Sequence, residues 1–250
     1  MTIGIIPARY GSSRLPGKPL ADICGKPMIW WPYMRAKTIS ELDEVYVATD
    51  DDRIIQVCKK YNMKAIMTSN KHKNGTERLS EVASLLKADY YVAIQGDEPL
   101  FDTRTVPLVL ELVHKDGIDC ALLKTPFKNP IDLINCTSAK VVTDLNDNAM
   151  YFSRSPMPYP KASLDYKIYD PIGVVAYTRE MLLKYGTLEM GPLEKAEEIE
   201  FLRLLEHGYK IKVGTVDYEC LEVNTPKDLE RVRKYVQEHD SEQKFLKEAK

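Results

Sequence analysis

The chain opens with a short apolar strand and a cationic, glycine-containing loop, Ile3-Gly4-Ile5-Ile6 followed by Pro7-Ala8-Arg9-Tyr10-Gly11-Ser12-Ser13-Arg14-Leu15-Pro16-Gly17-Lys18-Pro19-Leu20. The strand lacks polar alternation, so we expect it to be buried on both faces, as in a parallel sheet. Ligands of open α/β sheets bind beyond the carboxyl ends of the strands. The loop therefore occupies the place where such a fold holds its ligand.

Strand and helix patterns alternate through the rest of the first half. They predict strands at 44–49, 64–68 and 90–95, helices over 51–61, 76–87 and 103–114, and an earlier helix that begins at Pro27 and is kinked or shortened by Pro32. This order implies parallel strands joined by right-handed crossovers. We therefore predict an α/β fold with helices on both faces of the sheet.

The second half has a different rhythm. It predicts strands at 139–143 and 149–153 around a turn at 144–148, a strand at 172–177, one helix over 192–207 with Gly208 as its C-cap, a strand at 210–216, and a last helix with Thr225 as its N-cap. The charged tail 241–250 is expected to be frayed. We expect a single domain over 1–250 that carries a small insert at about 125–170.

The composition excludes several classes of protein. The chain has 250 residues, with 35 Lys and Arg against 37 Asp and Glu, so its net charge of −2 argues against a general nucleic-acid binder. No apolar run approaches the ~18 residues of a membrane span, and no signal peptide is predicted at the N-terminus. Five widely spaced cysteines without a C-x-x-C pair favour reduced thiols, so we expect a cytoplasmic protein without a membrane partner.

The composition of the first loop favours phosphate binding. Glycines let backbone N–H groups approach phosphate oxygens, and Arg9, Arg14 and Lys18 would neutralise a polyanion. The loop is not a P-loop, because five residues separate Gly11 from Gly17 and Lys18 is followed by proline. On composition alone, an exposed cationic turn remains the alternative.

A second candidate follows the strand predicted at 90–95, in the stretch Gln95-Gly96-Asp97-Glu98-Pro99. A carboxylate at the tip of a buried strand suits a magnesium ligand that bridges phosphates. Asp97 read by itself is equally compatible with a residue that caps a turn. The cationic loop shifts the balance, because polyphosphate and Mg²⁺ sites usually occur together.

These motifs, with three further stretches, resemble the CMP-Kdo synthetases (3-deoxy-manno-octulosonate cytidylyltransferases), most closely the capsule-type branch. The further stretches are His72-Lys73-Asn74-Gly75-Thr76-Glu77-Arg78, Tyr151-Phe152-Ser153-Arg154-Ser155-Pro156-Met157-Pro158, and Pro192-Leu193-Glu194 running to Glu197, Glu200 and Arg203. The resemblance covers the chain to about Tyr235. It implies a Rossmann-like, mostly parallel sheet of the nucleotide-diphospho-sugar transferase type with a dimerisation insert.

The resemblance implies an activity and a set of roles. CTP and a 2-keto-3-deoxy sugar acid would give a CMP-sugar and pyrophosphate with Mg²⁺, for bacterial surface polysaccharide, in a homodimer. The implied catalytic residues are Arg9, Lys18 and Asp97; the nucleotide-binding residues are Pro7, Ala8, Arg9, Ser12, Arg14, Lys18, Asn74, Gly75, Arg78 and Asp97; the sugar-acid residues are Gln95, Arg154 and Glu197, with Arg154 as the carboxylate partner; and the metal ligands are Asp97 and Asn224.

The sequence departs from the family pattern at three places. Asn224 stands for the Asp of a V-D-T-P motif, Pro171 and Val175 stand for the His and Tyr of an H-x-G-I-Y motif, and Asn74 stands for Ser. Lost hydroxyl-binding groups should change or loosen the choice of acceptor. Two alternatives therefore stay open: a nucleotidyltransferase for another sugar acid, polyol phosphate or phosphonate, and a nucleotide-binding protein with impaired turnover.

Overall fold

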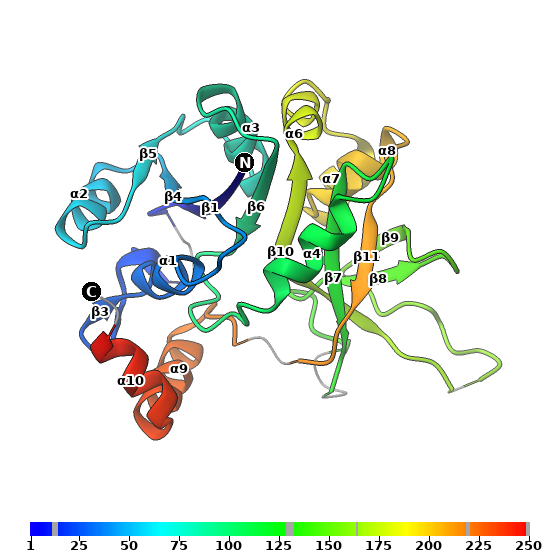
Figure 1. Ribbon diagram of the computed structural model, residues 1–250. Coiled ribbons are helices and arrows are strands. Elements are labelled where there is room, and N and C mark those ends of the chain that lie inside the picture. Colours follow the sequence, from blue (N-terminus) through cyan, green and yellow to red (C-terminus); the bar gives the residue numbers. More distant parts are fainter. Residues whose placement is uncertain (12–14, 129–132, 164, 219–220, 249–250) are drawn as a thin grey trace. The chain divides into compact units, whose positions relative to one another are not determined.

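The chain groups into two compact units, and the expected single domain over 1–250 stays a prediction. The structure is a computed structural model that describes residues 1–11, 15–128, 133–163, 165–218 and 221–248. Unit 1 comprises Met1–Val82, Ala93–Thr103 and Cys220–Lys250, and unit 2 comprises Ala83–Val92 and Arg104–Glu219. Both units combine strands with helices (Figure 1), so the predicted α/β class is confirmed. Among the described residues, no helix has the length and apolar character needed to cross a bilayer.

Unit 1 is built on a parallel sheet of β1 (Thr2–Ala8), β4 (Glu44–Thr49) and β5 (Ala65–Met67). Ile3, Ile5 and Ile6 of β1 are at most 1% exposed, which confirms the predicted burial of both faces of this strand. The other elements of unit 1 are η1 (Lys18–Leu20), β2 (Asp22–Ile23), β3 (Lys26–Pro27), α1 (Trp30–Ala36), α2 (Asp52–Lys60), α9 (Pro226–Glu238) and α10 (Asp240–Glu248). In the sequence, α3 (Gly75–Leu85) and β6 (Tyr90–Ile94) run across the boundary between the units.

The first helix begins later than predicted. Pro27 belongs to β3, which pairs with β2 in a two-stranded ribbon, and α1 starts at Trp30. Pro32 is therefore the third residue of α1. The first turn of a helix has backbone N–H groups without an intrahelical acceptor, so a proline there removes no helical hydrogen bond. The predicted start at Pro27 is wrong, whereas the predicted shortening agrees with a helix of seven residues, Trp30–Ala36.

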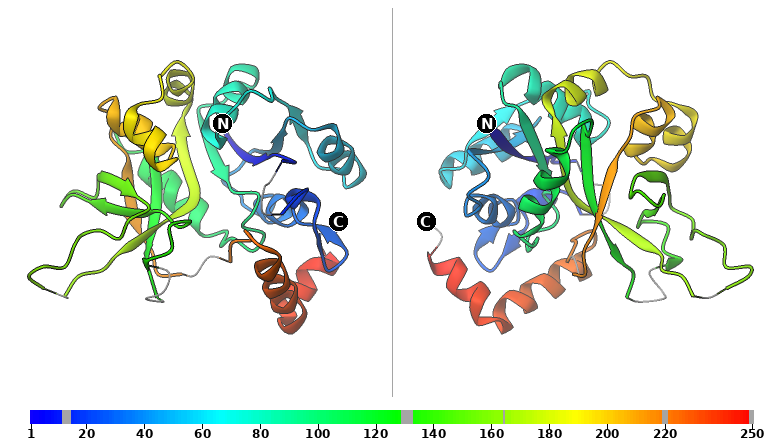
Figure 2. Two further views of the ribbon diagram at one scale, coloured as in Figure 1. Left: turned by 180° about the vertical axis from the view of Figure 1, so that it is seen from behind. Right: turned by 45° about the vertical axis from the view of Figure 1, so that its right-hand side comes forward.

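The C-terminal tail forms a helix where a frayed segment was expected. Figure 2 shows α9 leading into α10. Phe245 of α10 lies 6.0 and 6.1 Å from the rings of Trp30 and Trp31, measured between ring centroids. Glu242 pairs with the guanidinium of Arg35. These contacts attach α10 to α1 and account for order in a segment whose composition suggests none.

Unit 2 has β7 (Cys120–Pro126) at the centre of its sheet. β10 (Tyr169–Thr178) pairs with β7 in the antiparallel direction and β11 (Lys212–Thr215) pairs with it in the parallel direction. α4 (Thr105–Val113) packs against all three strands. The remaining elements are β8 (Lys140–Thr143), β9 (Ala149–Ser153), α6 (Arg179–Tyr185), α7 (Pro192–Glu197) and α8 (Phe201–Glu206).

The predicted hairpin around residues 144–148 is present. β8 and β9 are antiparallel, with Val141 opposite Phe152, and Tyr169 of β10 pairs with Val141. Asp144 stabilises the turn, because its carboxylate accepts hydrogen bonds from the backbone N–H groups of Asn146 and Asn148, at 2.8 Å each. The hairpin lies within the segment that the sequence analysis expects to be an insert.

The single helix expected over 192–207 is two helices. Glu198, between α7 and α8, has a φ of 51°, a left-handed conformation that an uninterrupted helix does not contain. The prediction was wrong because apolar periodicity alone does not reveal which distant groups donate hydrogen bonds to the backbone carbonyls at such a break. Gly208 has a φ of 80°, consistent with its predicted place at the end of α8.

The start of α9 follows the prediction. Thr225 is the N-cap, Pro226 is the first helical residue, and Asp228 completes a capping box. Burial raises the pKa of Asp228, but hydrogen bonds from Thr225 and Asn224 outweigh this effect and hold the pKa below its ordinary value. The capping box thereby also fixes the backbone of Asn224, whose N–H donates to Asp228.

Replacing Phe245 should detach α10. We expect Phe245→Ala to lower the free energy of unfolding by about 1–2 kcal/mol, because the ring loses its two tryptophan contacts. Hydrogen exchange of the α10 amides should become faster. Lys247→Ala, an exposed change in the same helix, is the control; equal exchange in both variants would contradict the proposed role of Phe245.

The capping box predicts a pH dependence of stability. Because the folded-state pKa of Asp228 is lowered, its carboxylate stabilises the protein above the unfolded-state pKa of about 4, and this contribution is lost as the pH falls through the folded-state pKa. Asp228→Asn should therefore lower Tm at pH 7, with the difference from wild type closing at acidic pH. Thermal unfolding between neutral and acidic pH tests this. Glu238→Gln, at the other end of α9, is the control; a difference for Asp228→Asn that is independent of pH would contradict the assignment.

Candidate active site

The loop after β1 is closed by a contact between its two ends. The backbone N–H of Gly17 donates to the carbonyl of Tyr10 at 3.2 Å. Gly17 has a φ of 68°, and a Cβ at this position would lie 3.2 Å from the Tyr10 ring. The guanidinium of Arg53 stacks on that ring, 3.3 Å from its centroid. Tyr10 is thus held between Arg53 and the backbone of Gly17, and only glycine fits.

Lys18 is the centre of the unit 1 site. Its ammonium donates to Asp97 Oδ2 at 2.6 Å, to the carbonyl oxygen of Val223 at 3.0 Å and to Asn224 Oδ1 at 3.3 Å. The side chains of Lys18 and Asp97 are 14% and 26% exposed, so the pair lies near the surface but is largely shielded. Three of the predicted site residues therefore meet in space, although two of them are more than 75 positions from Lys18 in the sequence.

Two local features bring Asp97 and Asn224 to this point. Gly96, which comes after β6 in the sequence, lies so close to β1 that a Cβ there would be 3.1 Å from the carbonyl oxygen of Pro7. The backbone N–H of Val223 donates to the carbonyl of Asp97 at 2.8 Å, which joins the two segments. The sequence analysis predicted neither the close approach of Gly96 to Pro7 nor the backbone contact between Val223 and Asp97.

The oxygens around Lys18 form a donor set that suits a hard cation. A carboxylate, a side-chain amide oxygen and a backbone carbonyl are the kinds of ligand that Mg²⁺ and Ca²⁺ accept. Within the described ranges, no group of three or more His, Cys, Asp or Glu side chains is arranged to bind a metal. Asp97 and Asn224 therefore offer side-chain oxygens whose chemistry fits a magnesium ion.

The remaining unit 1 candidates differ in their surroundings. Ala8 is buried and 4% exposed, Pro7 and Gln95 are half-buried, and Arg9 is exposed. Gln95 accepts the backbone N–H of Glu98 at 3.3 Å through its carbonyl, which shapes the turn after β6. Ser12 and Arg14 lie outside the described residues.

Asn74, Gly75 and Arg78 lie together at the start of α3. Asn74 Oδ1 accepts the backbone N–H of Glu77 at 2.8 Å, so Asn74 caps the helix that begins at Gly75. Serine and asparagine are both good N-cap residues, which makes the departure from the family pattern neutral for the helix. The 4% exposed Arg78 donates to Thr68 Oγ1 and lies 3.3 Å from Asp50 Oδ2.

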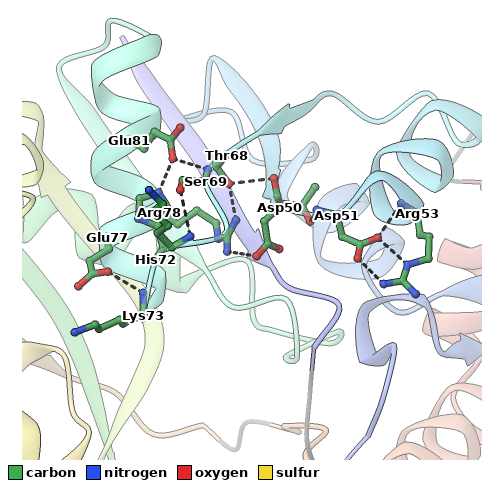
Figure 3. Close-up of polar contacts among 12 residues, drawn as sticks. Asp50, Asp51, Arg53, Thr68, Ser69, His72, Lys73, Glu77, Arg78 and Glu81 are labelled. Carbon is green, nitrogen blue, oxygen red and sulfur yellow. Dashed lines mark hydrogen bonds and ion pairs between the residues drawn. The ribbon is translucent and has the colours of Figure 1, made fainter.

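The sequence analysis missed a partner of this cluster. His72 is hydrogen-bonded to Glu81, which also accepts the backbone N–H of Ser69 at 2.8 Å (Figure 3). Burial raises the pKa of Glu81, but these hydrogen bonds outweigh that effect and leave the pKa below its ordinary value. Glu81 thereby fixes the loop that leads into Asn74. The spacing of nine residues between His72 and Glu81 is no recognised motif, so the sequence carried no signal for the pair.

Unit 2 brings Arg154 and Glu197 together. Glu197 accepts hydrogen bonds from Ser153 Oγ at 2.6 Å and from the backbone N–H of Arg154 at 2.9 Å. Arg154 Nε in turn donates to the carbonyl of Glu197 at 2.6 Å. The two residues predicted from the family pattern are therefore neighbours, and each one orients the other.

The guanidinium of Arg154 donates to four backbone carbonyl groups. Besides Glu197, these acceptors belong to Cys136 and Thr137, at 3.0 Å each, and to Glu198, at 3.2 Å. Arg154 thus donates hydrogen bonds to the backbone carbonyls of Glu197 and Glu198 at the break between α7 and α8. We call this set of contacts the Arg154 clasp.

Lys140 supports the clasp from inside the fold. Its side chain is fully buried, and its ammonium donates to the carbonyls of Asn135 at 2.7 Å, Ser138 at 3.0 Å and Arg154 at 3.0 Å. Burial lowers the pKa of this lysine below its ordinary value. The sequence analysis had placed Lys140 only within a strand.

Pro171 and Val175 lie on β10 on either side of an irregularity in its pairing with β7. Pro171 is opposite Lys124, whereas Val175 is opposite Leu122 and is only 1% exposed. Neither side chain carries a polar atom. Val175 is therefore a packing residue of unit 2, which explains how the fold tolerates valine at a position where the family has tyrosine.

Comparison with known proteins agrees with these motifs. The chain matches the cytidylyltransferase family over residues 3–211. A 3-deoxy-manno-octulosonate cytidylyltransferase of Solibacter usitatus is 43% identical over 232 residues, covering 92% of each chain. An 8-amino-3,8-dideoxy-manno-octulosonate cytidylyltransferase of Shewanella pealeana is 43% identical over 234 residues, covering 90% of this chain and 94% of its own.

A solved structure extends the likeness to three dimensions. A CMP:2-keto-3-deoxy-manno-octonic acid synthetase complexed with CTP is 41% identical and superposes with a TM-score of 0.89, covering 95% of this chain and 98% of its own. The fold, the motifs and the sequence identity agree along nearly the whole length. The chain belongs to the cytidylyltransferase family.

Proposed function

We propose that this chain transfers the cytidylyl group of CTP to a 2-keto-3-deoxy sugar acid, 3-deoxy-manno-octulosonate or a close relative, and releases pyrophosphate. The observation that carries the proposal is the convergence of Lys18, Asp97 and Asn224 beside the cationic loop of β1, in a member of this family. The anomeric hydroxyl of the sugar forms a bond to the α-phosphorus, the bond from that phosphorus to the β-phosphate oxygen breaks, and the hydroxyl proton passes to solvent.

The protein contributes positioning and charge to this reaction. In this proposal Arg9, Arg14 and Lys18 hold the triphosphate and neutralise the departing pyrophosphate, and Ser12 and the backbone of Pro7 and Ala8 are further contacts of the nucleotide. Asp97 and Asn224 would hold magnesium, which when bound neutralises charge on the phosphates. Arg9 is exposed and Lys18 is partly exposed, which is compatible with contact to a ligand that arrives from solvent.

The remaining candidate residues are assigned to binding of the cytosine base and of the sugar-acid acceptor. We assign Asn74, Gly75 and Arg78 to recognition of the cytosine base, and Gln95, Arg154 and Glu197 to recognition of the sugar acid. The burial of Arg78 against Asp50 and Thr68 supports a fixed wall for the base. The Arg154 clasp supports a role in shaping the acceptor site through the backbone as well as through charge.

The proposal extends to the state of the protein in the cell. A homodimer formed through the insert at about 125–170 fits the hairpin of β8 and β9, where Met150 is exposed. A cytoplasmic location fits the free thiols of Cys24, Cys58, Cys120 and Cys136.

Of the two alternative functions, a nucleotide-binding protein with impaired turnover is the less favoured, because Asn224 directs an oxygen to the same point as Asp97.

The choice of acceptor is directly testable. We expect pyrophosphate release from CTP and Mg²⁺ with both 3-deoxy-manno-octulosonate and its 8-amino-3,8-dideoxy analogue, with values of kcat/KM that differ by less than about 100-fold. The reason is that the side chains of Pro171 and Val175 have no group to hydrogen-bond an acceptor hydroxyl. A preference of about 10⁴-fold for either acid would contradict this loosened selection. CTP binding without pyrophosphate release for any acid in a panel would indicate a nucleotide-binding protein instead.

The closed loop of β1 predicts a second effect. Gly17→Ala should weaken CTP binding by more than about tenfold, because a left-handed alanine costs about 1–2 kcal/mol and its Cβ would also displace the Tyr10 ring. Gly25→Ala is the matched control, since Gly25 has a φ of 87° but no atom within 4 Å of the added Cβ. Calorimetric titration with CTP measures both variants. Equal losses would show that the Tyr10 contact is irrelevant to binding.

A further inference from the structure

The ammonium of Lys18 occupies the centre of the donor set assigned to the metal. It has three N–H donors, and its three acceptors are a carboxylate oxygen, an amide oxygen and a backbone carbonyl, between 2.6 and 3.3 Å away. These acceptors come from the segment after β6 and the segment before α9. The lysine thus satisfies the same oxygens that a divalent cation would need.

An ammonium and a magnesium ion cannot share this position. Mg²⁺ requires oxygen ligands at about 2.0–2.1 Å, and a nearby positive charge repels it. We propose that the Lys18 ammonium is the resident cation of this site in the nucleotide-free protein, and that a divalent metal enters only when the phosphates of a nucleotide draw the ammonium away. This inference rests on the proposed function, because it takes the ligand to be a nucleoside triphosphate.

The single positive charge of the ammonium balances the charge of the two side chains assigned to the metal. Asp97 contributes one negative charge and Asn224 contributes none, so the single charge of Lys18 neutralises the pair of side chains. An aspartate at 224 would leave one negative charge for a metal to neutralise. The departure of this chain from the family pattern therefore favours the lysine over the metal as long as no nucleotide is bound.

The surroundings of Lys18 allow the required movement. A lysine ammonium is a point charge on a flexible stem of four carbons, so it can exchange a carboxylate partner for a phosphate without a change in the backbone. Its side chain is partly exposed and begins directly after the left-handed Gly17, at the end of the loop proposed to bind the triphosphate. Metal and nucleotide binding are then coupled, and each increases the affinity for the other.

Metal binding to the nucleotide-free protein tests the proposal. Free Mn²⁺ is measured by electron paramagnetic resonance in titrations of wild type, Lys18→Met, Lys18→Met/Asp97→Asn and the control Lys59→Met, an exposed residue of α2. We expect Lys18→Met to bind Mn²⁺ about 5- to 150-fold more tightly than wild type. Lys59→Met should match wild type, and the added Asp97→Asn should abolish the gain.

Three outcomes would overturn the inference: wild type binds Mn²⁺ as tightly as Lys18→Met, neither protein binds it, or the gain survives Asp97→Asn. Circular dichroism establishes that each variant is folded, and Lys18→Gln replaces Lys18→Met if the latter is not. Asn224→Asp in the presence of Lys18 gives an independent check, because its extra negative charge should also raise Mn²⁺ affinity. Pyrophosphate release by wild type is assayed separately, so a failure of the proposed function is distinguished from a failure of this inference.

Discussion

The contact between the Lys18 ammonium and the Asp97 carboxylate organises the candidate site. It joins the end of the β1 loop to the tip of β6, and through Val223 and Asn224 to the start of α9. Two further constraints make the contact possible. Gly96 permits a close approach to Pro7, and the capping box of α9 holds the backbone of Asn224. A buried strand, a glycine and a helix cap therefore act together to gather oxygens around one cation.

The two units contain different kinds of polar arrangement. In unit 1, the central cation meets side-chain oxygens and one carbonyl near the surface, where phosphates could compete for it. In unit 2, Lys140 and Arg154 direct their N–H groups to backbone carbonyls, and Lys140 is fully buried. The first arrangement is suited to an exchange of partners. The second is suited to holding a fixed backbone geometry.

Local signals in the sequence predicted much of the fold. The apolar run of β1, the turn at 144–148 and the cap at Thr225 each depend on neighbouring residues, and each is present in the structure. Contacts distant in sequence account for the failures. Arg154 donates hydrogen bonds to the carbonyls at the break after α7, and Phe245 packs on Trp30 to order α10. No pattern within either segment carries that information.

The candidate site was predictable to a similar extent. The resemblance selected Lys18, Asp97 and Asn224, which the structure brings together, but it did not indicate that the lysine would lie between the other two. It likewise selected Arg154 and Glu197 as neighbours without revealing that the guanidinium is engaged with the main chain. Spacing along the chain identifies which residues take part. Only the tertiary arrangement determines which atoms each residue contacts.

The Arg154 clasp has a consequence for redesign of the enzyme. Because the Arg154 side chain connects residues 136 and 137 with the end of α7, these segments depend on one another structurally. Replacing α7 with a helix from a relative, without its matching loop, would place carbonyls of one parent protein against the arginine of another. Chimeras that aim to alter acceptor preference need to exchange β9, the loop and the helix as one module.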